Sequence, residues 1–195
     1  MDKHMKTLLQ ILIEVFIVLG ILMLIQSQVM MLTKVYQWSM YDTLSEGDLL
    51  LTEKLSYRFT QPKRGDVIIL LAQKEKGIKG SRVGILLEDY KKELTGEEAR
   101  TRYVKRLIGL PGDTITISNG DVFINGEKIE ENYVTGETKP RKLAETIMVP
   151  EGYVFVMGDN REKSLDSRYF GCMPIENIES RVMWRIFPHP GVISH

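Results

Sequence analysis

A continuous apolar segment near the N-terminus constrains this chain most strongly. Residues 8–25 read LLQILIEVFIVLGILMLI, interrupted only by Gln10 and Glu14. As a helix rising about 1.5 Å per residue the segment is about 27 Å long, close to the roughly 30 Å of a bilayer core. The following QSQVMM offers no small-residue cleavage site of the kind that ends a removable leader. We therefore expect an uncleaved transmembrane helix.

The charges that flank the apolar segment predict its orientation. Lys3 and Lys6 precede it, whereas only Lys34 lies in the next twenty or so residues. Positively charged flanks of a membrane helix stay on the cytoplasmic side. The sequence thus predicts a cytoplasmic N-terminus and transmembrane anchor in residues 1–33, and an extracytoplasmic domain in residues 34–195.

Composition excludes several classes of protein. Lys and Arg together number 26, as do Asp and Glu, so no net positive charge favours a nucleic-acid partner. A single cysteine, Cys172, forms neither an intramolecular disulfide nor a multi-cysteine zinc site, and we expect no metal and no cofactor. The histidines, at positions 4, 189 and 195, are poorly placed for a Ser/His/Asp triad. A hydrolytic site in this chain would therefore need a carboxylate or a lysine as its base.

Beyond the anchor, short apolar runs with β-like alternation are separated by turn residues. The runs are DLLLTEKL (48–55), DVIILLA (66–72), YVKRLIGL (103–110), DTITIS (113–118), DVFIN (121–125), YVFVMG (153–158) and SRVMWRIF (180–187). SNGD at 118–121 is the strongest hairpin signal, because Asn-Gly tolerates positive φ angles. The fold class expected is mainly β, with an antiparallel, barrel-like domain after the transmembrane helix.

One stretch departs from this pattern. Residues 73–102 are rich in Lys and Glu, and we interpret them as an insertion or surface flap. GEEAR, at Gly96–Arg100, suggests a helical turn or two within it.

Three polar segments are candidates for chemistry. The first, QWSMYDTLSEGDLLL (37–51), contains Ser39 just after the anchor, although a serine there is equally compatible with an ordinary loop. In the second, RYVKRLIGLPGD (102–113), alternation along a strand sends Lys105 and Arg106 to opposite faces. Of these two cations only lysine can release its proton near neutral pH, but most Lys-Arg pairs are simply solvated.

The third segment, MGDNREKSLDSRYFG (157–171), follows an apolar run and balances its charges. It contains three acidic and three basic side chains: Asp159, Glu162, Asp166, Arg161, Lys163 and Arg168. Such balance indicates either paired charges that hold the shape of a loop or a solvated surface loop whose ion pairs contribute little.

Together, the three segments resemble the bacterial type I signal peptidases. Ser39-Met40 is similar to the family's Ser-Met-x-Pro-Thr nucleophile segment, and Arg64–Val67 to its next strand entry. Residues 103–113 resemble its lysine strand, which ends in Gly-x-Pro-Gly-Asp. Residues 158–168, followed by Phe170-Gly171, match its Gly-Asp-Asn-x-x-x-Ser-x-Asp-Ser-Arg signature. The resemblance covers nearly the whole chain in the same order.

The resemblance implies a single-pass serine endopeptidase of the bacterial cell membrane that removes signal peptides from exported preproteins after small residues. Its implied partners are these preproteins, membrane lipid and the secretion machinery, without nucleic acid. The implied roles are Ser39 as nucleophile, Lys105 as general base, Met40 in substrate binding, Ser164 as hydrogen-bond partner of the Lys105 amine, and Asp166 with Arg168 as a structural ion pair.

Two positions depart from the family pattern or leave a role open. Asp42 replaces the family's proline and adds a carboxylate near the nucleophile, which would raise the pKa of a neighbouring lysine. Gln37 stands where some relatives carry a hydroxyl that assists the Ser39 backbone N–H as oxyanion donor.

Two other functions are compatible with parts of the sequence. A catalytically altered paralogue would act as an assembly or chaperone-like partner for exported proteins, and Asp42 is its only support. A self-cleaving repressor with a Ser/Lys pair would be expected to carry a DNA-binding domain where this chain has its apolar segment.

Overall fold

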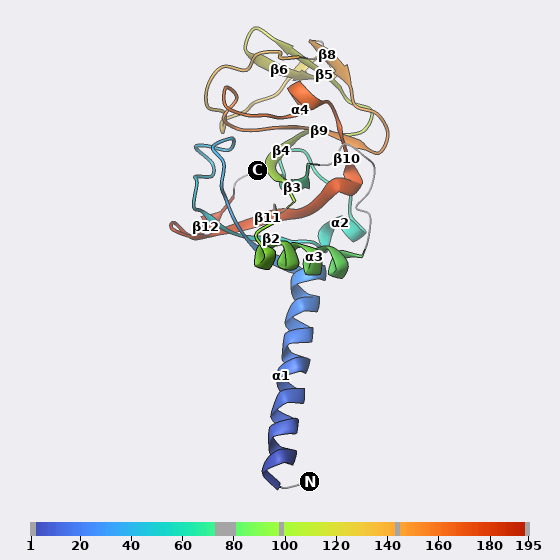
Figure 1. Cartoon of the computed structure of the whole chain (residues 1–195). Coiled ribbons are helices and arrows are strands. Elements are labelled where there is room, and N and C mark those ends of the chain that lie inside the picture. The colour runs from blue at the N-terminus through green and yellow to red at the C-terminus, as the bar shows by residue number, and fades with distance from the viewer. Residues whose placement is uncertain (1–2, 73–80, 98–99, 143–144, 194–195) are drawn as a thin grey trace.

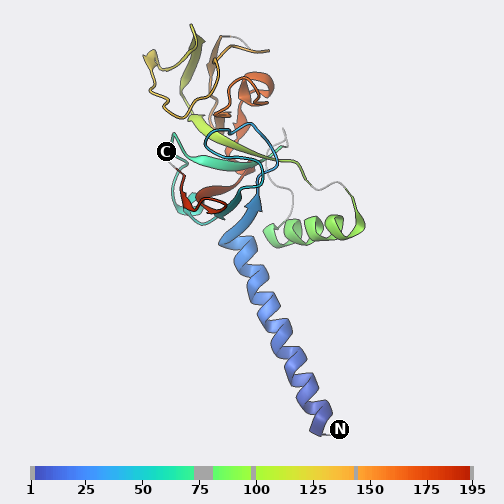
Figure 2. The ribbon, with the colours of Figure 1, turned by 90° about the vertical axis from the view of Figure 1, so that its left-hand side faces the viewer.

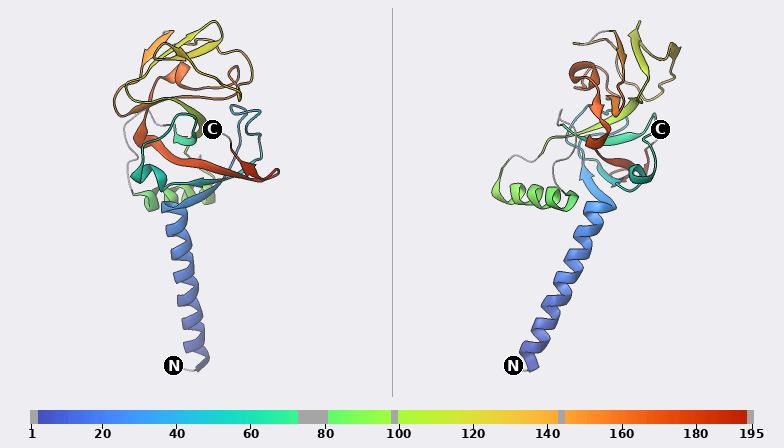
Figure 3. Two further views of the ribbon diagram at one scale, coloured as in Figure 1. Left: turned by 180° about the vertical axis from the view of Figure 1, so that it is seen from behind. Right: turned by 90° about the vertical axis from the view of Figure 1, so that its right-hand side faces the viewer.

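The computed structural model describes residues 3–72, 81–97, 100–142 and 145–193. A long helix, α1 (Lys3–Gln28), projects from one end of a mainly β domain (Figures 1 and 3). Within the described residues, α1 is the one helix long and apolar enough to cross a bilayer, and its apolar side chains are exposed. The N-terminal helix expected from the sequence is therefore present.

The larger sheet forms the body of the domain and is antiparallel throughout. Its strands are paired in the order β1-β2-β11-β3-β4-β9-β10, and β12 pairs with β11. Their bounds are β1 Met30–Lys34, β2 Leu49–Glu53, β3 Val67–Leu71, β4 Arg102–Gly109, β9 Tyr153–Met157, β10 Met173–Pro174, β11 Ile178–Phe187 and β12 Gly191–Val192. Among the described residues no pairing joins β1 to β10, so the sheet is curled and open. This confirms a mainly β, barrel-like domain.

A smaller antiparallel sheet lies at the end of the domain away from α1 (Figure 1). Its order is β7-β6-β5-β8, with β5 Thr114–Ser118, β6 Asp121–Ile124, β7 Glu127–Lys128 and β8 Thr146–Met148. Ser118 pairs with Asp121 across a two-residue turn in which Asn119 and Gly120 have φ angles of 52° and 86°. Positive φ at both positions is the geometry of a tight hairpin, so the predicted hairpin is confirmed.

Short helices complete the fold. They are α2 (Ser56–Phe59), α4 (Ser167–Phe170) and the 3₁₀ turn η1 (Ile175–Asn177). A longer helix, α3, spans Arg82–Thr95. The helical turn expected at Gly96–Arg100 includes residues 98–99, which lie outside the described residues; the described helix, α3, ends at Thr95. The Ser81 side chain accepts the Gly84 N–H to begin α3, and Gly96 ends it in the left-handed conformation. Residues 73–80 and 98–99 lie outside the described part.

The central strand β3 is buried on both faces and positions the strand beside it. Val67 and Ile69 pack into one apolar cluster, and Ile68 and Leu70 into another that also contains Leu107 of β4. Because β3 pairs with β4 along its whole length, the core fixes the height and register of β4.

Candidate active site

The candidate nucleophile lies in the connection between β1 and β2. The backbone N–H of Asn160 donates to the Ser39 carbonyl at 3.1 Å, and its side-chain amide donates to the Trp38 carbonyl at 3.1 Å. Two hydrogen bonds from one residue of the loop after β9 thus hold the peptide groups on both sides of Ser39.

Met40, the residue after the candidate nucleophile, is almost completely buried. Its side chain is buried in the apolar cluster formed by Val35, Leu44, Leu50 and neighbours. The Leu44 N–H donates to the Met40 carbonyl at 2.7 Å, and this turn directs the methionine inward. In this structure Met40 is a core residue beneath the nucleophile loop, and its buried position does not support the expected role in substrate binding.

Lys105 lies in the middle of β4 with its amine against the candidate nucleophile. Its Nζ donates to Ser39 Oγ at 2.6 Å and to the Val104 carbonyl at 3.2 Å. The side chain is only 1% exposed, and the Tyr103 ring centroid lies 5.4 Å from Nζ. As strand alternation indicates, Arg106 points to the other face, towards Asp159.

Burial makes the neutral form of the Lys105 amine more accessible than it is in water. Burial lowers the pKa of Lys105 from its usual value of 10.5 to about 8. The negative charges of Asp166 and Asp159 oppose this by raising the pKa, and Arg168 lowers it. Asp42, which the sequence suggested as the interfering anion, does not contribute: its carboxylate instead accepts a hydrogen bond from Thr135 Oγ1 at 3.3 Å.

Gly158, directly after β9, is packed tightly against the nucleophile segment. A β-carbon built there would overlap both the Ser39 carbonyl oxygen and the Ser164 side chain. Only glycine fits this backbone contact, so Gly158 sets how near the loop comes to Ser39.

Asp166 and Arg168 form a two-pronged ion pair inside the loop. Arg168 Nε and Nη2 each donate to an Asp166 oxygen at 2.9 Å, and both side chains are fully buried. Asp166 also accepts the backbone N–H groups of Gly158 and Arg168. The carboxylate is thus held by backbone and guanidinium together, and it defines the shape of the loop.

Ser164 is buried beside Gly158, but its hydroxyl has no hydrogen-bond partner among the described residues. The hydrogen bond expected between Ser164 and the Lys105 amine is not formed in this structure, where Nζ donates to Ser39 Oγ and the Val104 carbonyl.

Of the six charged side chains in residues 158–168, Asp166 and Arg168 pair with each other, and Asp159 and Arg161 pair with partners outside the loop. Arg161 binds the Glu131 carboxylate and Thr138, and Asp159 binds Arg106 of β4. Sequence reasoning matched Asp159 and Asn160 to a signature but gave them no role. The only signal was their position directly after the buried strand β9.

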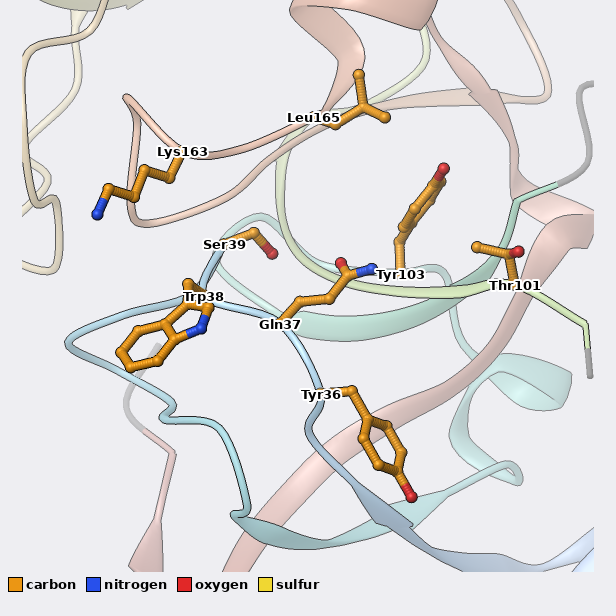
Figure 4. A pocket seen from close by; sticks show the side chains of 8 residues that line it. All are labelled: Tyr36, Gln37, Trp38, Ser39, Thr101, Tyr103, Lys163 and Leu165. Carbon is orange, nitrogen blue, oxygen red and sulfur yellow. The ribbon is translucent and has the colours of Figure 1, made fainter.

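Ser39 opens into a cleft of about 650 Å³ (Figure 4). Its lining comes from the nucleophile segment (Tyr36, Gln37, Trp38 and Ser39), from β4 and its approach (Thr101 and Tyr103), and from the loop after β9 (Lys163 and Leu165). The Gln37 side chain extends into the cleft from the segment that carries Ser39 (Figure 4).

A serine hydroxyl hydrogen-bonded to a buried lysine of lowered pKa, at the edge of an open cleft, is the arrangement of a serine hydrolase that uses lysine as its base. Comparison with known families agrees with this class: the family described as "Signal peptidase, peptidase S26" matches residues 8–187. The chain belongs to this signal peptidase family.

Individual relatives carry related names. The chain is 35% identical to the probable signal peptidase I-1 of Synechocystis over 77% of this chain and 67% of that one. It is 38% identical to the chloroplastic thylakoidal processing peptidase 1 of Arabidopsis thaliana over 80% of this chain and 41% of that one. It is 35% identical to the signal peptidase I of Bacillus caldolyticus over 77% and 75%. The chain thus spans between 41% and 75% of the length of these three relatives.

Proposed function

We propose that this protein is a membrane-bound signal peptidase I, a serine endopeptidase that removes N-terminal signal peptides from exported preproteins after small residues. The observation that carries the proposal is the 2.6 Å contact between Lys105 Nζ and Ser39 Oγ at the edge of the cleft. Membership of the signal peptidase family supports the choice of substrate.

The dyad supplies both the nucleophile and the proton transfers. Neutral Lys105 takes the Ser39 hydroxyl proton as the oxygen attacks the scissile carbonyl carbon. The resulting ammonium gives this proton to the leaving amine, and the acyl-serine ester remains. Lys105 then takes a proton from a water molecule as that water attacks the ester carbonyl, and returns the proton to Ser39 Oγ as the acid product leaves. With a pKa of about 8, roughly one Lys105 side chain in ten is neutral at pH 7.

The tetrahedral intermediate needs hydrogen-bond donors at its oxyanion. We assign this role to the Ser39 backbone N–H and to the side-chain amide of Gln37, which lines the cleft in the same segment. An amide reaches further than the hydroxyl that some relatives carry there, so it can donate from a backbone position two residues before the nucleophile.

We expect the cleft to prefer small residues because its walls exclude large side chains. A closely walled site rejects a large side chain by steric clash more decisively than it attracts a small one. Tyr103 and Leu165 form two of the cleft walls. A precursor with Ala at the cleavage site should be cut by the detergent-solubilised protein and the same precursor with Phe there should not. Equal cutting of both would refute the proposed specificity.

We place the β domain outside the cytoplasm of a bacterial cell, with α1 crossing the membrane once and its N-terminus in the cytoplasm. The support is the apolar helix α1, with Lys3 and Lys6 at its start. Preproteins, membrane lipid and the secretion machinery are the partners this arrangement requires. Protease added outside spheroplasts should digest the β domain, and its protection would show the reverse orientation.

The alternative of a catalytically altered assembly partner rests on Asp42. Its carboxylate binds Thr135 and has no part in the pKa of Lys105, so it gives no reason for inactivity. The decisive test is incubation of the purified full-length protein with a signal-peptide-bearing precursor, with Ser39→Ala as the matched control. Cleavage by the wild-type protein alone is expected, and no cleavage by either would favour the assembly role.

A further inference from the structure

The helix α3 presents an apolar face away from the β domain. Leu87 and Leu94, seven residues apart, are 51% and 88% exposed, and Tyr90 between them is 41% exposed. Val83 lies four residues before Leu87, so these side chains form one stripe along the helix. An exposed apolar stripe is the opposite of what a helix on a water-exposed surface normally shows.

The other face of α3 is attached to the β domain, and this fixes how the helix is rotated. Asp89 forms an ion pair with Arg102 at the start of β4, and Arg102 also binds Glu179 of β11 at 2.6 Å. Ile85, four residues before Asp89, is 5% exposed. Because these contacts hold the opposite side of the helix, Leu87 and Leu94 cannot turn inward without breaking them.

The position of α3 places that apolar stripe at the end of the transmembrane helix. Figures 1 and 2, taken from perpendicular directions, both show α3 lying crosswise to α1 where α1 meets the domain. Tyr90 Oη donates to Gln26 Oε1 in the last turns of α1 at 2.7 Å. Gln26 directly follows the apolar run 8–25, so α3 is level with the boundary of the bilayer core.

We propose that the outer face of α3, formed by Val83, Leu87, Tyr90 and Leu94, lies in the headgroup boundary of the bilayer that α1 crosses. The inference rests on the membrane anchor of the proposed function and adds a second lipid contact to it. A helix parallel to the membrane plane with one apolar side is the form that interfacial helices take. Exposed Lys91 beside Leu87 can extend its amine to lipid phosphates while its methylene stem covers apolar surface.

This contact has a consequence for the cleft. The chain continues from α3 through Thr101, which lines the cleft, into β4, which carries Lys105. A signal peptide is itself held in the membrane, so an α3 seated on the bilayer sets the height of the cleft above the lipid where the cleavage site emerges.

The test measures the environment of single side chains in the full-length protein. Leu94→Cys, Leu87→Cys and, as control, Glu93→Cys each receive an environment-sensitive fluorophore in a Cys172→Ala background. Glu93 is exposed and lies one turn after Asp89, on the domain-facing side. Burial raises the pKa of the Cys172 thiol to about 11, so the same labelling at neutral pH in the natural Cys172 background is a second route should the alanine variant not fold.

The labelled proteins are reconstituted into vesicles of phosphatidylcholine and phosphatidylglycerol. Nitroxide groups on the lipid acyl chains should quench the probes at 87 and 94 severalfold more than the probe at 93, and aqueous iodide should show the reverse order. Equal quenching of all three by iodide would overturn the proposal. Shielding of 87 and 94 from both quenchers would also overturn it, and would indicate a second protein copy on this face. Neither quenching measurement requires cleavage, so a negative result for α3 leaves the proposed function unaffected.

Discussion

The guanidinium of Arg106 and the carboxylate of Asp159 are completely buried against each other, with Nε–Oδ1 and Nη2–Oδ2 distances of 2.9 and 2.7 Å. Thr43 Oγ1 donates to the same carboxylate at 2.6 Å. The lysine strand, the nucleophile loop and the loop after β9 therefore meet at Asp159. The ion pair fixes, from the far side of β4, the distance between Ser39 and Lys105.

Arg106→Met should destabilise the protein severely. It removes one partner of a buried pair and leaves the Asp159 charge uncompensated, which typically costs about 3–5 kcal/mol. Equilibrium unfolding of the full chain in mild detergent measures the change, with Lys128→Met as a control because Lys128 is an exposed lysine of β7. A loss no larger than that of the control would show that the pair is not needed for stability.

The pH dependence of cleavage reports the charge on Lys105. With a lowered pKa, the neutral base becomes more abundant as pH rises, so kcat/KM should rise with pH and level off above about 8. The Asp166 charge raises the pKa of Lys105, so Asp166→Asn should move this rise to lower pH. Asp42→Asn should leave it in place, because Asp42 has no part in that pKa. A shift with Asp42→Asn and none with Asp166→Asn would reverse the assignment.

Gly158→Ala should impair cleavage more than most buried substitutions of similar size. The added β-carbon overlaps the Ser39 carbonyl and Ser164, so the nucleophile segment must move away from Lys105. Displacements of this size at a reacting group lower rates by about 100-fold. Gly191→Ala is the matched control, since a β-carbon there meets no atom within 4 Å. Comparable rates for the two variants would contradict the close-approach argument.

Alternation along the chain predicted the seven main strands, and it placed Lys105 and Arg106 on opposite faces because side chains in a strand have a strict period of two. The direction of Met40 was not predictable in this way. It depends on a turn between Met40 and Leu44 that has no alternation. The partners of Asp159 and Arg161 come from distant segments, so charge balance within the loop was a poor guide to them.

The helix α3 illustrates a different limit. Its apolar stripe is visible in the sequence, but the Lys and Glu content of residues 73–102 favoured the interpretation as an insertion or surface flap. Which side of the stripe faces outward is set by the ion pair of Asp89 with Arg102, a contact made only in the folded chain.

Ser164→Ala should have a small effect on stability. The hydroxyl is buried without a partner among the described residues, so removing it also removes the cost of desolvating it. The free energy of unfolding should change by less than about 1 kcal/mol or increase. A loss of about 2 kcal/mol or more, together with a shift of the pH profile to higher pH, would show that Ser164 binds the Lys105 amine in solution.

If Lys105 is the base for Ser39, its replacement by methionine must lower the rate of precursor cleavage. Methionine retains the length and apolar character of the side chain but cannot accept a proton. Lys105→Met should fold, and its cleavage rate should fall by about three orders of magnitude or more, whereas Lys128→Met should cleave normally. Near-normal cleavage by folded Lys105→Met would show that another group is the base for Ser39.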